Sequence, residues 1–185
     1  MRILLCIALV AAFAAQAAEV AGVRLEDKTQ VESRELVLNG AGLRKRLFFN
    51  VYVIGLYLPE KLKDARAVLS AAGPKRADIH MLRDVGADQF IEALVDGLRA
   101  NTSEEEMKAH EPRIKQLSDT MAALKEAKKG MRIALDWTGA ATQLVVNGKP
   151  AGAPIAGEDF YRALLRIWIG ERPVQDDLKK ALLGA

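Results

Sequence analysis

The chain has 185 residues, of which 50% are hydrophobic, and a formal net charge of +3 at pH 7. This length suits one ordinary domain, and this hydrophobic content excludes bulk disorder and collagen-like structure. The small positive charge permits an anionic partner but gives no reason to expect a nucleic-acid-binding protein.

The first 17 residues are typical of a secretory signal peptide. Arg2 precedes an apolar run over Ile3–Phe13, and the small-x-small triplet AQA ends at Ala17. The run is too short to span a membrane. Cys6, the only cysteine, has most of the apolar run after it, which argues against lipoprotein attachment. We therefore expect a periplasmic or secreted mature protein, residues 18–185, with no disulfide and no thiolate metal site.

The N-terminal half predicts mainly strands. Runs rich in β-branched and aromatic residues predict strands over Glu19–Leu25, Glu35–Leu38, Leu43–Leu58 (one bent strand or two) and Arg76–Arg83. A short helix is expected over Asp64–Ala71, where Gly73 and Pro74 follow.

The middle of the chain predicts two helices. Gly86–Arg99 is the first, because its apolar residues Phe90, Leu94 and Leu98 recur every four positions. Ser103 with Glu106 forms a capping-box pattern that begins the second, which ends before Gly130. The second helix has one apolar stripe: Ile114, Leu117, Met121 and Leu124.

The C-terminal part predicts a β-hairpin and two helices. Strands over Met131–Asp136 and Gln143–Val146 precede the turn dipeptide Asn147-Gly148 and a third strand into Ile155. Helices are expected over Phe160–Ile169 and Val174–Leu183. This order of elements favours a single α+β domain, residues 18–185, in which helices cover one face of a mainly antiparallel sheet.

Generic catalytic and metal-binding motifs are absent from the sequence. No glycine-rich phosphate loop and no GxSxG occurs, and His80 and His110 lack metal-ligand spacing. We expect His110 to be solvated in a charged helix and His80 to lie on an exposed strand face. The sequence therefore assigns no catalytic residue, metal or cofactor, and we expect no nucleic-acid partner.

Arg44 and Tyr52 form a candidate anion clamp. They lie in the segment LNGAGLRKRLFFNVYVIGLYL, where Asn39 and Gly40 permit a tight turn before Arg44. The two residues share strand parity but are too far apart to touch along one straight strand. If the segment folds back as a hairpin, they can meet and hold a carboxylate or phenolate. The alternative is a surface arginine at a strand end and a half-buried core tyrosine.

The same segment resembles the chalcone isomerase family, especially its bacterial branch. The resemblance continues through LRDV at Leu82, through NGK at Asn147 and through the helix that ends in IWIG at Gly170, and it covers Val23 to Gly184. It implies an open-faced β-sandwich, in which helices cover a large antiparallel sheet.

The resemblance argues against chalcone isomerase activity. Of the enzyme's polar groups, only the arginine has an equivalent, Arg44. Tyr52 stands at the threonine position, Phe90 at the tyrosine position, Gly97 near the asparagine, and Leu178 near the late Ser or Thr. Each lost hydrogen bond to the developing anion costs roughly 10²-fold in rate, so we expect no isomerase activity.

The arginine and tyrosine instead resemble the fatty-acid-binding branch of the family. There they hold the lipid carboxylate while a cleft between sheet and helices takes the tail. The resemblance makes Arg44 and Tyr52 ligand-binding candidates, with Arg83 as a second anion contact. Phe48, Phe90 and Leu94 are the candidates for lining the cleft, with ordinary helix–sheet core as the alternative for the last two.

Two functions from different classes therefore remain open. The first is a non-catalytic periplasmic protein, monomeric in our expectation, that binds a small hydrophobic carboxylate such as a fatty acid. The second is an interaction protein whose cleft is filled by its own side chains and whose mark is an exposed apolar patch. An isomerase or lyase acting on a small hydrophobic substrate is a weaker third.

Overall fold

The computed structural model describes residues 18–184, so the expected signal peptide and its cysteine lie outside the described residues. Within that range the chain forms a seven-stranded antiparallel sheet in the order β11-β10-β9-β6-β5-β4-β3. Its strands are β3 (Lys28–Val31), β4 (Arg34–Arg46), β5 (Phe49–Leu58), β6 (Lys75–Met81), β9 (Arg132–Trp137), β10 (Ala141–Val146) and β11 (Lys149–Ala156).

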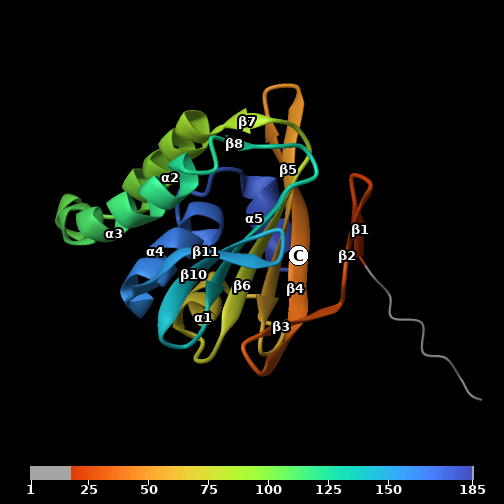
Figure 1. Cartoon of the computed structure of the whole chain (residues 1–185). Helices are drawn as coiled ribbons and strands as arrows, with labels where there is room; N and C mark the ends of the chain where they lie inside the picture. Colours follow the sequence, from red (N-terminus) through yellow and green to blue (C-terminus); the bar gives the residue numbers. More distant parts are fainter. Residues whose placement is uncertain (1–17, 185) are drawn as a thin grey trace, which may run out of the picture.

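Helices cover one face of this sheet and a small hairpin covers part of the other (Figure 1). The hairpin consists of β1 (Ala18–Val20) and β2 (Val23–Leu25), and a separate short pair consists of β7 (Val85–Gly86) and β8 (Glu126–Ala127). The helices are α1 (Ala65–Ser70), α2 (Ala87–Asn101), α3 (Glu104–Ala122), α4 (Glu158–Ile169) and α5 (Asp176–Leu182). The α+β class and the helix-covered antiparallel sheet are confirmed.

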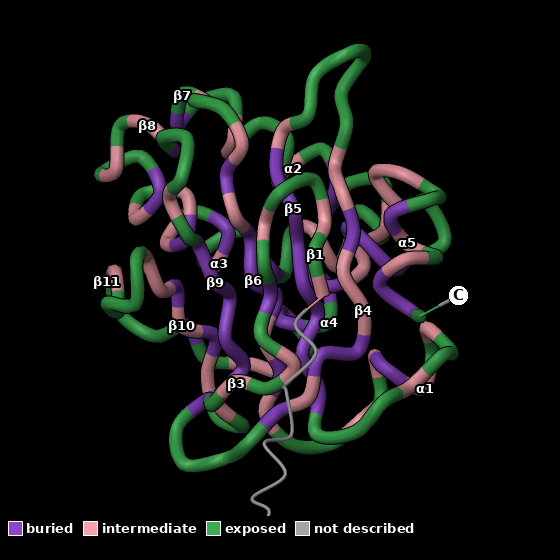
Figure 2. The backbone as a smooth tube through the Cα atoms, turned by 90° about the vertical axis from the view of Figure 1, so that its right-hand side faces the viewer, coloured by how far each residue is buried: buried purple, intermediate pink, exposed green. Residues whose placement is uncertain are grey.

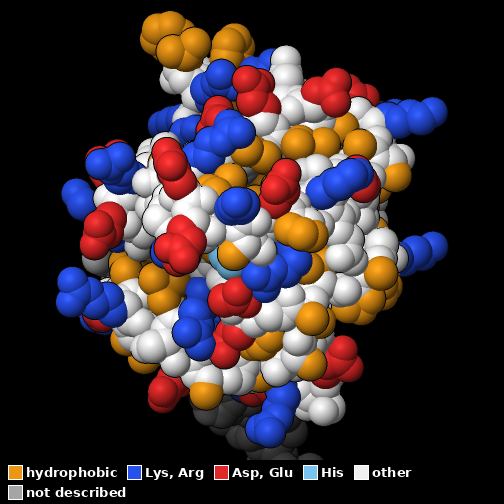
Figure 3. Space-filling view, turned by 90° about the vertical axis from the view of Figure 1, so that its left-hand side faces the viewer, with side chains coloured by type: hydrophobic (Ala, Val, Ile, Leu, Met, Phe, Trp, Pro, Cys, Tyr) orange, Lys and Arg blue, Asp and Glu red, His pale blue; other side chains and the backbone are white. Residues whose placement is uncertain are grey.

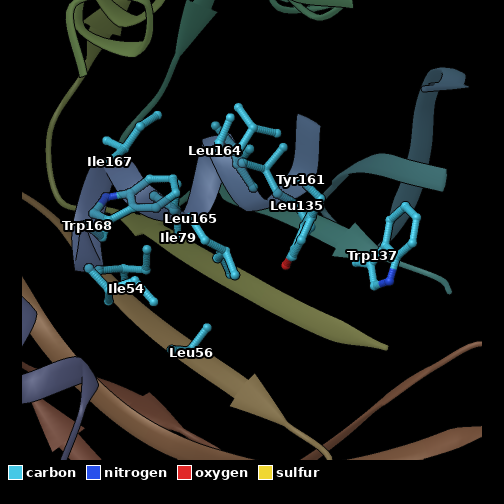
Figure 4. Packing of buried hydrophobic residues seen from close by; sticks show 14 of the residues in the cluster. Ile54, Leu56, Ile79, Leu135, Trp137, Tyr161, Leu164, Leu165, Ile167 and Trp168 are labelled. Carbon is cyan, nitrogen blue, oxygen red and sulfur yellow. The ribbon is translucent and has the colours of Figure 1, made fainter. Parts of the chain in front are cut away.

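The main hydrophobic core lies between the sheet and α4. Helix α4 buries eight of its twelve residues, and its apolar side chains pack on the strands β5, β6 and β9 (Figure 4). Gly97 lets α2 approach α4 closely, because a Cβ there would lie 2.8 Å from a methyl carbon of Ile167. A smaller core, which includes Leu25, Val53 and Tyr57, lies on the opposite face beneath the β1–β2 hairpin.

The predicted capping box at Ser103 and the predicted turn at Asn147-Gly148 are both confirmed. The Ser103 side chain accepts from the backbone N–H of Glu106, whose carboxylate accepts in return from the N–H of Ser103. Asn147 and Gly148 have φ values of 49° and 78° and form the β10–β11 turn. No helix within residues 18–184 is long and apolar enough to span a membrane.

The expected turn at Asn39 and Gly40 is wrong. Both residues lie inside β4, which runs without a break to Arg46. The glycines serve the packing of α5: a Cβ on Gly40 would lie only 2.7 Å from the carbonyl oxygen of Leu182. Asn39 is buried and donates to that same carbonyl oxygen at 2.7 Å, which ties β4 to the C-terminal helix.

Three further expectations need correction. The predicted strand Glu19–Leu25 is two strands, because Ala21 and Gly22 adopt positive φ and turn the chain. His110 is buried rather than solvated: its ring is 3% exposed and packs edge-on against Phe160, because α3 turns that side toward α4. His80 is only partly exposed, with Nε2 3.2 Å from a carboxylate oxygen of Asp78.

Candidate functional site

A cavity of about 670 Å³ opens between the helices and the half of the sheet that carries Arg44 and Tyr52. Its walls are apolar and come from strands on one side and helices on the other. The strand side includes Ile79, Ile133, Leu135 and Leu144, and the helix side includes Phe90, Leu94, Leu117, Met121 and Ile167. This volume is within the range of about 300–1,000 Å³ that is usual for small-molecule sites.

Charged residues gather where the cavity opens to solvent. The arginines there come from β4 (Arg44 and Arg46), from the segment after β6 (Arg83) and from the segment after α4 (Arg172). In the described part of the chain, none of these four forms an ion pair with an acidic side chain. The opening also carries carboxylates, of which Asp84 and Asp96 have other partners: a backbone N–H and Arg99. The cavity therefore has an apolar interior, and its charged lining consists of these four arginines and the three carboxylates of Asp84, Glu92 and Asp96.

The hairpin brings Arg44 and Tyr52 together. Strands β4 and β5 are joined by a tight turn, and their register places Arg44 directly opposite Tyr52. Both residues line the cavity, Tyr52 as a buried side chain with 8% exposure and Arg44 as a partly exposed one. The fold-back that the clamp hypothesis requires is thus present.

A buried hydrogen bond orients the Tyr52 hydroxyl. The indole Nε1–H of Trp168, on α4, donates to it at 2.9 Å. Burial raises the pKa of Tyr52, although this donor and the charge of Arg44 act in the opposite direction, so the phenol is protonated at neutral pH. Its O–H finds no acceptor among residues 18–184 and is available to an oxygen atom in the cavity.

Gln175 supports Arg44 from the C-terminal segment. Its side-chain oxygen accepts from the backbone N–H of Lys45 at 2.9 Å and lies 3.5 Å from a guanidinium nitrogen of Arg44. Its amide nitrogen donates to the carbonyl of Leu43 at 3.1 Å. Arg44 also donates to the carbonyl of Lys45. These contacts fix the strand around Arg44 and leave its other guanidinium N–H groups for an anion.

The remaining predicted residues divide into two groups. Phe90 and Leu94 do line the cavity, with Arg83 at its mouth. Phe48 does not: it is 97% exposed at the turn, because the hairpin projects beyond the helices that would cover it. Arg83 lies with its guanidinium 4.5 Å from the ring centre of Phe49, a cation–π contact that the sequence did not indicate.

Trp168 and Gln175 are the functional candidates that sequence reasoning missed. Trp168 has the appearance of a core residue, and it is 5% exposed, yet it also lines the cavity and bonds Tyr52. These residues lie more than a hundred positions from Arg44 and Tyr52 in the chain, so no local spacing pattern links them. Among residues 18–184, no group of three or more His, Cys, Asp or Glu side chains is placed to hold a metal ion.

Comparisons with known proteins agree with this architecture. The structure is similar to the fatty-acid binding protein AtFAP1 of Arabidopsis thaliana, with a TM-score of 0.65 and 14% sequence identity. The alignment covers 88% of this chain and 92% of that one, and at this identity it shows a shared fold. A search of curated protein sequences found no match. The family model described as chalcone isomerase-like matches residues 17–184, so the chain belongs to the chalcone isomerase-like family.

Proposed function

We propose that the protein binds a small amphipathic carboxylate, such as a fatty acid, and does not transform it. The observation that carries this proposal is the pair of Arg44 and Tyr52, on directly opposed strand positions, at the polar end of an apolar cavity. A guanidinium and a phenolic O–H together offer the charge and the hydrogen bonds that a carboxylate accepts. The apolar walls suit an alkyl chain.

The chemistry of the cavity wall supports binding over catalysis. Within the described residues, its lining contains no histidine, cysteine, serine, threonine or lysine. Its carboxylates are Asp84, Glu92 and Asp96, of which Asp84 accepts from a backbone N–H and Asp96 lies 3.6 Å from Arg99. Phe90 lines the wall where the enzymes of the resemblance place a tyrosine, so that hydroxyl is missing here. The fatty-acid binding protein AtFAP1 shares the fold, which makes a fatty acid the first ligand to test.

We further propose that this binding takes place in the periplasm or outside the cell. This rests on the N-terminal sequence alone, with its basic start, short apolar run and AQA triplet. The N-terminal residue of the protein recovered from a periplasmic fraction tests it: Ala18 is expected.

Native mass spectrometry of the processed protein tests the binding proposal. We expect wild type to carry, or to take up from solution, a fatty acid, and Arg44→Ala to lose it. Arg24→Ala is the matched control, because Arg24 is exposed on β2 at the opposite face of the sheet. A clean ligand-free mass for wild type, with no uptake of added fatty acids, would contradict the proposal and favour the interaction protein.

A further inference from the structure

The turn between β4 and β5 ends in three exposed apolar residues, which we call the apolar tip: Leu47, Phe48 and Phe49. Their exposed fractions are 84%, 97% and 56%, and they are the exposed large hydrophobic side chains of the described chain. Figure 2 shows the hairpin as an exposed loop that projects above the buried strands. Figure 3 shows hydrophobic atoms protruding at the same end of the molecule.

Phe49 gains a cation–π contact with Arg83, but the folded state gains no evident packing from the outermost residue, Phe48. Arg46 pairs with Phe49, so the turn itself is only Leu47 and Phe48. Leu47 has a φ of 54°, a left-handed conformation that glycine or asparagine adopts far more readily than leucine. The chain therefore places a strained, apolar residue where a polar turn residue would fold more easily. A strained and exposed apolar residue of this kind points to a contact with something outside the protein.

The surroundings of the tip are basic. Lys45 and Arg46 precede it and are exposed, and Arg83 stacks on Phe49. The hairpin carries no acidic residue at all between Glu35 and Glu60 in the sequence. Figure 3 shows Lys and Arg side chains directly beneath the protruding hydrophobic atoms, with acidic side chains beside them. The complement of this surface is apolar with negative charges at its border.

The tip also borders the mouth of the cavity. Arg46, Leu47 and Phe49 line the opening, while Phe48 points away from it. A surface on which the tip rests would therefore lie beside the cavity opening.

We propose that the apolar tip inserts into the interfacial region of an anionic lipid bilayer, with Lys45, Arg46 and Arg83 against the lipid headgroups. Aromatic and leucine side chains bordered by Lys and Arg are the composition of peripheral membrane anchors. Insertion places the cavity mouth at the bilayer surface. The inference goes beyond ligand binding, and it holds or fails whatever the cavity contains.

Vesicle flotation of the processed protein tests this inference. The probes are vesicles of phosphatidylcholine alone and vesicles of phosphatidylcholine with an equal part of phosphatidylglycerol. We expect wild type to float with the anionic vesicles, and to do so less at high salt because screening weakens headgroup contacts. The double variant Leu47→Asn/Phe48→Gly should lose at least about tenfold in partitioning, since two large apolar side chains are removed.

Two charge variants show whether the basic border contributes. Lys45→Glu/Arg46→Glu should weaken flotation with anionic vesicles. The matched control Lys61→Glu/Lys63→Glu makes the same charge change on exposed residues beyond the other end of β5 and should float as wild type does. A melting curve of each variant confirms folding. Equal flotation of wild type and the tip variant would overturn the inference.

Two more results separate this inference from the proposed function and from self-association. Phe48→Ser does not touch the cavity wall, so it should reduce flotation while fatty-acid uptake from solution stays unchanged. Sedimentation velocity of wild type and tip variant should give the same size. A wild-type dimer that the tip variant abolishes, together with no flotation, would make the tip a contact between copies and would overturn membrane docking.

Discussion

Removing one oxygen atom from Tyr52 should weaken both the fold and the site. In Tyr52→Phe the indole N–H of Trp168 loses its acceptor at 2.9 Å in a setting where both residues are almost fully buried. An unsatisfied buried donor costs about 1–3 kcal/mol. For a domain of this size, each kcal/mol lowers Tm by about 2–4 °C, so we expect a drop of roughly 2–12 °C.

The same substitution should reduce ligand affinity by a separate route. A hydrogen bond from the Tyr52 hydroxyl to a charged carboxylate contributes about 1.5–3 kcal/mol. Its loss corresponds to roughly a 10- to 100-fold rise in Kd for a fatty acid. Calorimetric melting of the ligand-free protein measures the first effect, and titration with a fatty acid well below Tm measures the second.

Tyr161→Phe is the matched control for this experiment. Tyr161 is also fully buried, and its hydroxyl donates to the carbonyl of Leu135 at 3.1 Å, but it does not line the cavity. It should lower Tm and leave Kd unchanged. If Tyr52→Phe leaves Kd unchanged, or if both variants raise Kd alike, the assignment of the Tyr52 hydroxyl to the ligand is refuted.

Three further variants test the turn, the β4 glycines and the buried carboxylate of Asp78. Leu47→Asn/Phe48→Gly should stabilise the protein by about 1–2 kcal/mol in chemical denaturation, because it relieves the left-handed leucine and creates an Asn-Gly turn. Gly42→Val should destabilise it by about 1–3 kcal/mol in the same assay and leave α5 more open to proteolysis, since a Cβ there would lie 2.7 Å from a methyl carbon of Leu178; an unchanged stability would contradict the packing role. Burial alone would raise the pKa of Asp78, but hydrogen bonds from His80 and Arg132 hold that pKa below its usual value. The ionised Asp78 side chain therefore stabilises the fold at pH values above the usual aspartate pKa. This stabilisation is lost as the pH falls through the pKa of Asp78 in the folded state. Urea midpoints measured from pH 7 down to pH 3 should therefore fall for wild type and change less for Asp78→Asn.

The fold was predictable because its local signals agree with its tertiary contacts. The capping box at Ser103, the Asn-Gly turn and the periodicity of α2 each hold in the structure. The error at Asn39 and Gly40 arose because a distant element decides the local structure. Gly40 and Gly42 look like turn residues, but α5 packs on them from the far end of the chain and only glycine leaves it room.

The site was predictable only in part, for the same reason. Residue parity placed Arg44 and Tyr52 on one face, and the hairpin brought them into register. Their supports Trp168 and Gln175 follow more than a hundred residues later, and a strand pattern contains no information about such partners. Phe48 was misplaced because strand composition does not reveal where a hairpin outgrows the helices that cover its sheet.

Strands β4 and β5 need contacts from the C-terminal segment, so the cavity can be complete only after that segment has folded onto them. Strands β4 and β5 are neighbours in sequence and can pair early, whereas Trp168, Gln175 and α5 contact them only across most of the chain length. Closing such long loops is slow compared with forming a hairpin. A nascent chain that lacks its last twenty or so residues therefore lacks the anchoring contacts of the β4–β5 hairpin, and the polar end of the cavity is incomplete until that segment is present.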